Sequence, residues 1–218
     1  MERAPVVIPT SHLIPFVVAS MLIIIVPGPS VLFTLARAVA WGRTVAVLTV
    51  LGNSVGTLLL SALVALGLGP LLQRYGSLSR VIQLAGGLYL IYLGVEALKY
   101  RRQHAAAMTA TGEKPSLSRI VRQGFTVGVL NPKSLVFFAA IFPHFVDRHH
   151  GSVTVQLLAL GVLFSVMAFC SDSTWGIVAG TAREWLAGDP RRLVALRTTG
   201  GVVMCGLGVS IVGAAAGL

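Results

Sequence analysis

Residues 27–33 read Pro-Gly-Pro-Ser-Val-Leu-Phe and lie in the middle of an apolar run that extends from His12 to Ala40. Proline removes a backbone donor and its ring clashes with the preceding turn, while glycine loosens the chain at the same place. We therefore expect the helix to break at Pro27 and Gly28. Because proline suits the first turn of a helix, a second half-helix should begin at about Pro29.

A similar stretch lies about 104 residues later, where residues 131–137 read Asn-Pro-Lys-Ser-Leu-Val-Phe within the apolar run from Ile120 to Val146. The same reasoning predicts a break at Asn131 and Pro132. A second pair of motifs also repeats: Gly86-Gly87 with Leu93-Gly94-Val95, and Gly200-Gly201 with Leu207-Gly208-Val209. The sequence thus indicates two related halves, at about residues 12–99 and 120–217, joined by a polar loop over residues 100–119.

Hydrophobic residues make up 55% of the chain and charged residues 11%, whereas soluble proteins carry about 25% charged residues. Six apolar stretches are each long enough for the roughly 20 residues of a membrane-spanning helix: His12–Ala40, Thr44–Leu66, Ser79–Leu98, Ile120–Val146, Val153–Gly180 and Leu193–Gly217. The runs are continuously apolar, which favours helices over barrel strands. We predict a single all-α integral membrane domain of about six transmembrane helices, with the first and fourth broken.

Each half contains three predicted spans, an odd number, so the second half should cross the membrane in the opposite sense to the first. Such an inverted 3+3 repeat is typical of secondary transporters, whose sites lie at the repeat interface near the bilayer midplane.

The net charge of +10 would suggest a nucleic-acid partner in a soluble protein. Here the basic residues cluster in short segments between apolar runs, so we expect a lipid bilayer and no nucleic acid as partner. The segments after the first, third and fifth spans hold 12 Lys and Arg residues: Arg37, Arg43, Lys99, Arg101, Arg102, Lys114, Arg119, Arg122, Arg183, Arg191, Arg192 and Arg197. The opposite side holds 4: Arg3, Arg74, Arg80 and Arg148. This bias predicts cytoplasmic basic loops and both termini outside.

The candidate transport residues are those at the two breaks and polar residues inside the spans: Pro27, Gly28, Pro29, Ser30, Asn53, Asn131, Pro132, Lys133 and Asp172. Half-helix amino termini expose N–H groups and a positive dipole end that suit a carboxylate. The alternative is that both breaks are kinks that only help packing.

The buried charges leave several roles open. An isolated cation at mid-depth costs about 2.5–3.5 kcal/mol on insertion scales, so Lys133 should face protein or water. It would contact an anionic substrate group or serve in gating, unless it forms a structural ion pair or snorkels to the interface. Asp172 could pair with Lys133, receive a substrate ammonium, carry a coupling proton or be a polar cap. The spacing Gly52-xxx-Gly56 predicts a close approach of two helices. Asn53, between these glycines, is either a hydrogen-bonding contact between helices or a ligand.

We expect neither a metal site nor a cofactor. Cys170 and Cys205 lie in apolar runs without metal-ligand spacing and suit small packing positions. The spacing of His144, His149 and His150 does not match a metal site either.

Several motifs together resemble the LysE/RhtB family of bacterial amino-acid exporters. They are Pro27-Gly28-Pro29, Gly52-xxx-Gly56, Gly86-Gly87 with Tyr89-Leu90-Ile91-Tyr92-Leu93-Gly94, Gly124-Phe125, Leu130-Asn131-Pro132-Lys133, and Phe142-Pro143-His144-Phe145-Val146. The resemblance covers nearly the whole chain. It implies a proton-driven exporter (an antiporter) of amino acids or their derivatives in the bacterial inner membrane, with a homodimer as one assembly. The family often has Asp or Asn where this chain has Ser30.

Two other classes compete with an exporter. An intramembrane enzyme is disfavoured because the sequence has no His-Glu-xx-His, Gly-x-Gly-Asp or Gly-x-Ser-x-Gly motif. A passive channel is disfavoured by the paired helix breaks, which favour alternating access. Counterflow would separate a carrier from a channel.

Overall fold

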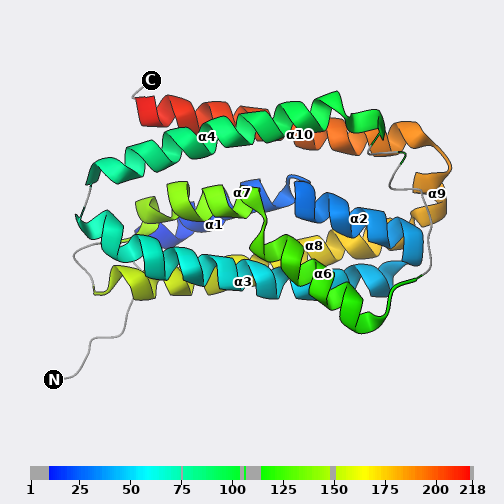
Figure 1. Ribbon diagram of the computed structural model, residues 1–218, viewed down its shortest axis with the longest axis horizontal. Helices are drawn as coiled ribbons and strands as arrows, with labels where there is room; N and C mark the ends of the chain where they lie inside the picture. Colours follow the sequence, from blue (N-terminus) through cyan, green and yellow to red (C-terminus); the bar gives the residue numbers. More distant parts are fainter. Residues whose placement is uncertain (1–9, 75, 104–105, 107–113, 148–150, 217–218) are drawn as a thin grey trace.

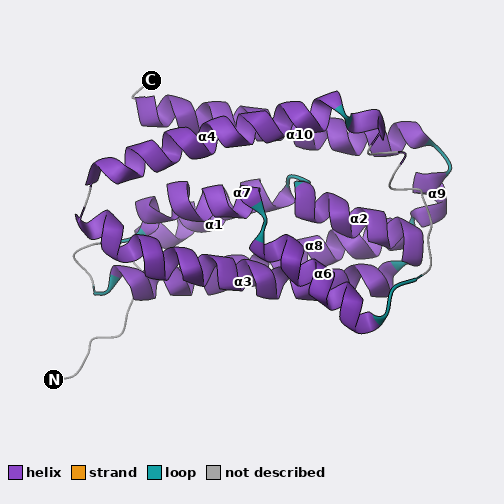
Figure 2. Ribbon diagram, in the orientation of Figure 1, coloured by secondary structure: helices purple, strands orange, loops and turns teal. Residues whose placement is uncertain are grey.

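The computed structural model describes residues 10–74, 76–103, 106, 114–147 and 151–216, and every regular element within these residues is a helix (Figure 2). In chain order the longer helices are α1 (Thr10–Ile25), α2 (Pro29–Trp41), α3 (Arg43–Arg74), α4 (Gly76–Lys99), α6 (Leu117–Val129), α8 (Val153–Thr181) and α10 (Pro190–Ala216). Shorter pieces are α7 (Pro132–Val136), the π-helical turn η1 (Phe137–Ile141), the 3₁₀ turn η2 (Phe142–Phe145) and α9 (Arg183–Ala187).

Four helical segments of the described chain are long and apolar enough to cross a membrane: Arg43–Gly67, Leu117–Phe145, Val153–Thr181 and Pro190–Ala216. The pair formed by His12–Ile25 and Pro29–Trp41 is a fifth span if its two halves, bent by 47°, are taken together. The predicted all-helical membrane architecture is therefore confirmed with four or five candidate spans. The six spans expected from the sequence are reached only if α4, a helix of 24 residues, also crosses the membrane.

The helices are arranged in layers (Figure 1). Helices α4 and α10 lie side by side and run in opposite directions, and they form one layer. Helices α3, α6 and α8 pack together in the opposite layer. The broken segments α1–α2 and α7 lie between the two layers, where α7 contacts α4 and α2 contacts both α3 and α8. This arrangement buries both helix breaks inside the protein.

Both predicted breaks are present. Helix α1 ends at Ile25 and α2 begins at Pro29, with Gly28 as its extended N-cap residue. Helix α6 ends at Val129 and α7 begins at Pro132. In each case proline occupies the first turn of the second half-helix, where its missing N–H costs nothing.

Glycines hold α3 and α6 in backbone contact. A Cβ atom on Gly52 would lie 2.1 Å from the carbonyl oxygen of Val121, and one on Gly56 would lie 2.2 Å from that of Phe125. The contact is equally tight from the side of α6, where a Cβ atom on Gly128 would lie 2.1 Å from the carbonyl oxygen of Asn53 on α3. The close helix approach expected from Gly52-xxx-Gly56 is thus confirmed, and Gly124-xxx-Gly128 is its counterpart on α6.

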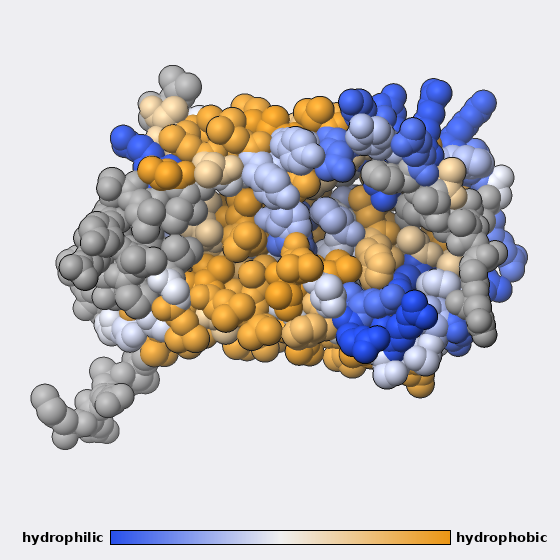
Figure 3. Space-filling view, in the orientation of Figure 1, coloured by the Kyte–Doolittle hydropathy of each residue, from blue (hydrophilic) through white to orange (hydrophobic). Residues whose placement is uncertain are grey.

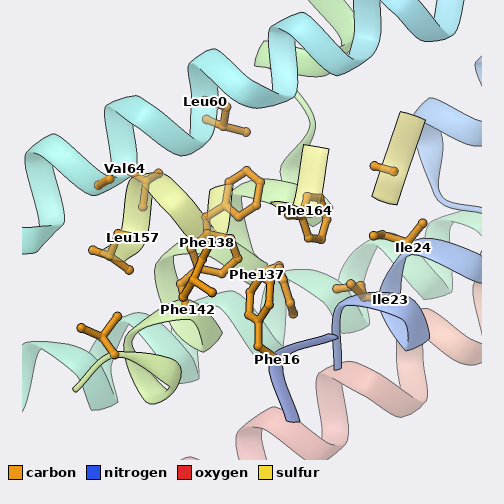
Figure 4. Packing of buried hydrophobic residues seen from close by; sticks show 14 of the residues in the cluster. Phe16, Ile23, Ile24, Leu60, Val64, Phe137, Phe138, Phe142, Leu157 and Phe164 are labelled. Carbon is orange, nitrogen blue, oxygen red and sulfur yellow. The ribbon is translucent and has the colours of Figure 1, made fainter. Parts of the chain in front are cut away.

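Aromatic side chains fill the space between the broken segments and α8 (Figure 4). The rings of Phe137 and Phe142 stand edge to face at 5.4 Å, and Phe138 lies 4.7 Å from Phe142. Phe16 from α1 and Phe164 from α8 belong to the same cluster. These contacts lock the π-helical turn that directly follows α7, so the second break is held between a rigid aromatic core and α3.

Strongly hydrophilic residues gather at one end of the molecule (Figure 3). We call it the basic end, because Lys99, Arg119 and Arg191 lie at the helix ends found there. This is the end where α4 finishes and where α6 and α10 begin, whereas α10 finishes at the other end (Figure 1). The expectation that Arg37 and Arg197 lie in loops is wrong, because they lie within α2 and α10. Arg37 is buried because its guanidinium lies over the rings of Phe33 and Trp41 and donates to Gln123 on α6. Most of the predicted loop over residues 100–119 lies outside the described residues, as do His149 and His150.

Candidate transport site

The two helix breaks meet at a small polar cavity in the middle layer. Its lining comes from five helices: Ile24 of α1, Ser30 and Val31 of α2, Asn53 and Thr57 of α3, Asn131, Lys133 and Ser134 at the start of α7, and Phe164, Ala168 and Asp172 of α8. Six of the nine residues expected to form a site are either in this lining or directly against it: Gly28, Ser30, Asn53, Asn131, Lys133 and Asp172.

Lys133 crosses from one break to the other. Its side chain is buried, and Nζ donates a hydrogen bond of 2.6 Å to the carbonyl oxygen of Val26. Val26 directly follows the last residue of α1, and a helix carboxyl end carries unpaired carbonyls and a negative partial charge. The ammonium does not stay beside the positive amino end of its own helix α7. Instead it reaches the negative end of the opposite half-helix, where its charge is compensated.

Asp172 is the acidic partner in the same cavity. It is buried, and its Oδ2 accepts a hydrogen bond of 3.4 Å from Nδ2 of Asn53. The charges of Asp172 and Lys133 interact electrostatically across the cavity. Asn53 therefore connects the glycine-packed α3 to the acidic group of α8, while its Oδ1 is buried without a hydrogen-bond partner.

A direct hydrogen bond between side chains also joins the two breaks. Nδ2 of Asn131 donates to Oγ of Ser30 at 3.0 Å, while Oδ1 of the same amide accepts from the backbone N–H of Lys133 at 3.1 Å. Asn131 thus caps α7 and binds the first turn of α2 with one side chain. This bond fixes the relative position of the two half-helices.

The cavity between these groups has a volume of ≈ 20 Å³. A water molecule needs about 10–15 Å³ by this measure, so the space suits one water molecule and excludes an amino acid. The polar groups around it are nevertheless those that bind a zwitterion: an ammonium, a carboxylate and an amide oxygen without a partner. The cavity therefore has the chemistry that a zwitterionic ligand requires but too small a volume to hold one.

Three expected residues lie elsewhere. Pro29 and Pro132 line a separate, larger cavity beside the polar one. The carbonyl oxygen of Pro27 lies against α10, since a Cβ atom on Gly200 would be 2.4 Å from it.

The sequence reasoning missed other site groups, although three of them had a signal. The carbonyl of Val26 becomes free because the helix breaks at the next residue, so the break itself indicated an acceptor here. Thr57 follows Asn53 by one helical turn and so shares its face. Ser134 stood inside the repeated motif. Phe164 and Ala168 are apolar residues of an apolar helix and gave no signal.

No group of three or more His, Cys, Asp or Glu side chains in the described part of the chain could hold a metal ion. Among the described residues, Cys170 and Cys205 are free thiols, and Cys205 lies against Gly94 at the contact between α4 and α10.

The sequence model of the LysE type translocator family matches residues 21–214, which include both breaks and every residue of the cavity. The chain belongs to the LysE type translocator family. With its long apolar helices, this translocator is a multi-pass membrane protein.

Relatives of this LysE type translocator are named as efflux proteins. It is 29% identical to the homoserine/homoserine lactone efflux protein of Salmonella typhimurium over 83% of this chain and 86% of that protein. It is 27% identical to the leucine efflux protein of Klebsiella pneumoniae over 71% of this chain and 73% of that protein. No solved structure matches this LysE type translocator.

Proposed function

We propose that this protein is a secondary active exporter of amino acids or their derivatives across the bacterial inner membrane, and that the cavity between Lys133 and Asp172 is its transport site. Family membership and the efflux proteins among its relatives support amino-acid export. The choice of site rests on one observation. Both helix breaks meet at a single cavity that contains a buried cation and a buried carboxylate.

The two charges suit the two ends of an amino acid. In this proposal the substrate carboxylate binds the ammonium of Lys133 at the start of α7, and the substrate ammonium binds Asp172. The hydrogen bond from Lys133 to Val26 then belongs to the empty carrier. A carboxylate draws the ammonium away from Val26, which couples binding to a change at the first break.

An exporter is favoured over a passive channel by the small volume of the cavity. A space of ≈ 20 Å³, with a hydrogen bond joining the half-helices beside it, gives no path for a solute of amino-acid size. Movement of the half-helices about their breaks would open it to one side at a time, as in other transporters built from broken helices.

We further propose that α4 is also a span and that the chain is an inverted 3+3 repeat. The repeat pairs Gly87 with Gly201 and Gly94 with Gly208. In space, Gly87 packs against Gly208 and Gly94 against Gly201. Exchanging the two halves turns the first contact into the second, which is what a two-fold axis between antiparallel helices produces. The basic end would face the cytoplasm and both termini the outside.

Asp172 is the proposed carrier of a coupling proton. It is a buried acidic group at the transport site, and it can be neutralised by either a proton or a substrate ammonium. If a proton and a substrate ammonium compete for Asp172, the export of one substrate molecule requires the entry of a proton.

Counterflow in proteoliposomes tests the proposed function. Vesicles loaded with unlabelled L-homoserine or L-leucine should accelerate uptake of the same labelled amino acid at least about tenfold, since a carrier returns faster when loaded. Lys133→Ala at equal incorporation should abolish the acceleration. Passive equilibration without trans-stimulation would indicate a channel, and wild-type counterflow in Lys133→Ala would refute the proposed site.

A further inference from the structure

A larger cavity lies directly beside the transport site, between α2, α4 and α10. It has a volume of ≈ 490 Å³, within the range of about 300–1,000 Å³ that is usual for small-molecule sites. The surface is hollowed in this region, between α4 and α2 and toward the basic end (Figure 3). The cavity of the transport site, in contrast, has a volume of only ≈ 20 Å³.

Two residues of opposite charge stand in the wall of this cavity. Glu96 comes from α4 and Arg197 from α10, and both side chains are half-buried. Their charges interact electrostatically. The rest of the wall is mainly apolar, with Leu32 and Phe33 on α2 and Met204 on α10. One cation, one anion and an apolar surface are the chemistry that an amino acid requires, because its ammonium and carboxylate are fixed on one carbon.

The two cavities are adjacent at both helix breaks. At the first break Pro29 lines the larger cavity and the next residue, Ser30, lines the transport site. At the second break Pro132 lines the larger cavity and the next residue, Lys133, lines the transport site. The first turns of α2 and α7 are thus the wall between them, and movement of these turns would join the two spaces.

We propose that the larger cavity is a first binding site for zwitterionic amino acids, which lies between the basic end of the protein and the transport site. The guanidinium of Arg197 binds the substrate carboxylate, which matches its fork of donors. The carboxylate of Glu96 binds the substrate ammonium, and the substrate side chain lies on Leu32, Phe33 and Met204. This inference rests on the proposed export function and adds a second binding step to it.

A competing account is that Glu96 and Arg197 only hold α4 against α10. The accounts differ in what the substrate must carry. L-homoserine has a carboxylate and an ammonium, whereas L-homoserine lactone keeps the ammonium and lacks the carboxylate. A structural pair treats both compounds alike, whereas a recognition site does not.

The test is transport into everted membrane vesicles, which present the cytoplasmic face outward, with labelled L-homoserine and L-homoserine lactone as probes. Arg197→Gln should raise the KM for homoserine at least about tenfold, as expected for loss of a charged hydrogen bond, and change that for the lactone less than about twofold. Glu96→Gln should raise both KM values. Arg191→Gln, an exposed arginine at the start of the same helix, is the matched control and should change neither.

The double variant Glu96→Gln/Arg197→Gln separates recognition from packing, because removing both members of a structural pair is close to neutral. It should keep the wild-type melting temperature and still transport homoserine with a raised KM. A wild-type KM in the double variant would overturn the first binding site and leave the proposed function intact. So would an equal change in the KM values of both probes in Arg197→Gln. Failure of the wild-type protein to transport either probe or L-leucine would instead refute export itself.

Discussion

Gly28 lies directly against the side chain of Lys133, so that a Cβ atom at position 28 would be 2.8 Å from Cδ and 3.2 Å from Nζ of the lysine. The lysine ammonium is at the same time bonded to the carbonyl oxygen of Val26. Glycine at position 28 therefore leaves room for the side chain of Lys133 from the second break, in addition to breaking the helix.

Gly28→Ala should consequently impair transport more than folding. The added methyl group displaces the flexible lysine side chain, and loss of its charged hydrogen bond to the substrate carboxylate, worth about 1.5–3 kcal/mol, corresponds to at least a tenfold fall in efflux. The melting temperature in detergent should stay near that of the wild type, since a side chain yields more easily than backbone. Gly206→Ala is the matched control, because nothing lies within 4 Å of its added Cβ atom. A wild-type efflux rate in Gly28→Ala would contradict the importance of the Lys133 position.

Removing the two buried charges singly and together should separate stability from transport. Lys133→Met leaves Asp172 buried without its opposing charge, a change that costs on the order of 3 kcal/mol. The double variant Lys133→Met/Asp172→Asn removes both charges and should regain most of that loss in a thermal melt. Efflux should be absent from both proteins. If the double variant regains stability and efflux together, the charges are structural.

Asp172→Asn alone should uncouple export from the proton gradient. The amide can still accept from Asn53 through its carbonyl oxygen, so the local geometry is kept, but it cannot take up and release a proton. Wild-type vesicles should lose concentrative transport when an uncoupler is added. The variant should show slow equilibration at a rate that the uncoupler does not change. Uncoupler-sensitive concentrative transport by the variant would assign the proton to another group.

Gly128→Ala should destabilise the protein through the contact between α3 and α6. Its Cβ atom would lie 2.1 Å from the carbonyl oxygen of Asn53, and two backbones must then move apart at a cost of about 1–3 kcal/mol or more. Gly67→Ala, within α3, has open space around its Cβ atom and should be tolerated. Yield and melting temperature measure the difference. Equal stability of the two variants would mean that the helices are less tightly packed than described.

Cysteine labelling should place the basic end inside the cell. In a background without Cys170 and Cys205, an impermeant thiol reagent added to intact cells should label Ser152→Cys and leave Lys114→Cys unlabelled until the membrane is opened. Both positions are exposed. The reverse pattern would invert the proposed topology.

The sequence by itself determined the elements of this protein and the points at which they break. Local chemistry suffices for that: a long apolar run predicts a membrane helix, and Pro27 or Pro132 within such a run ends one half-helix and begins the next. The repeated stretches around these prolines also marked Asn131 and Lys133 as candidate site residues by their position alone. Gly52 and Gly56 predicted a close helix contact in the same way, because only missing side chains permit backbones to meet.

Only the tertiary structure decided which groups these elements bring together. The ammonium of Lys133 bonds to Val26 of the other half, Asp172 meets Asn53 across 119 positions of sequence, and Arg37 is buried within a helix where a loop was expected. Glu96 of α4 and Arg197 of α10 share one cavity. The physical reason is that hydropathy and backbone propensity act along the chain, whereas the partner of a buried charge is set by how helices distant in sequence pack.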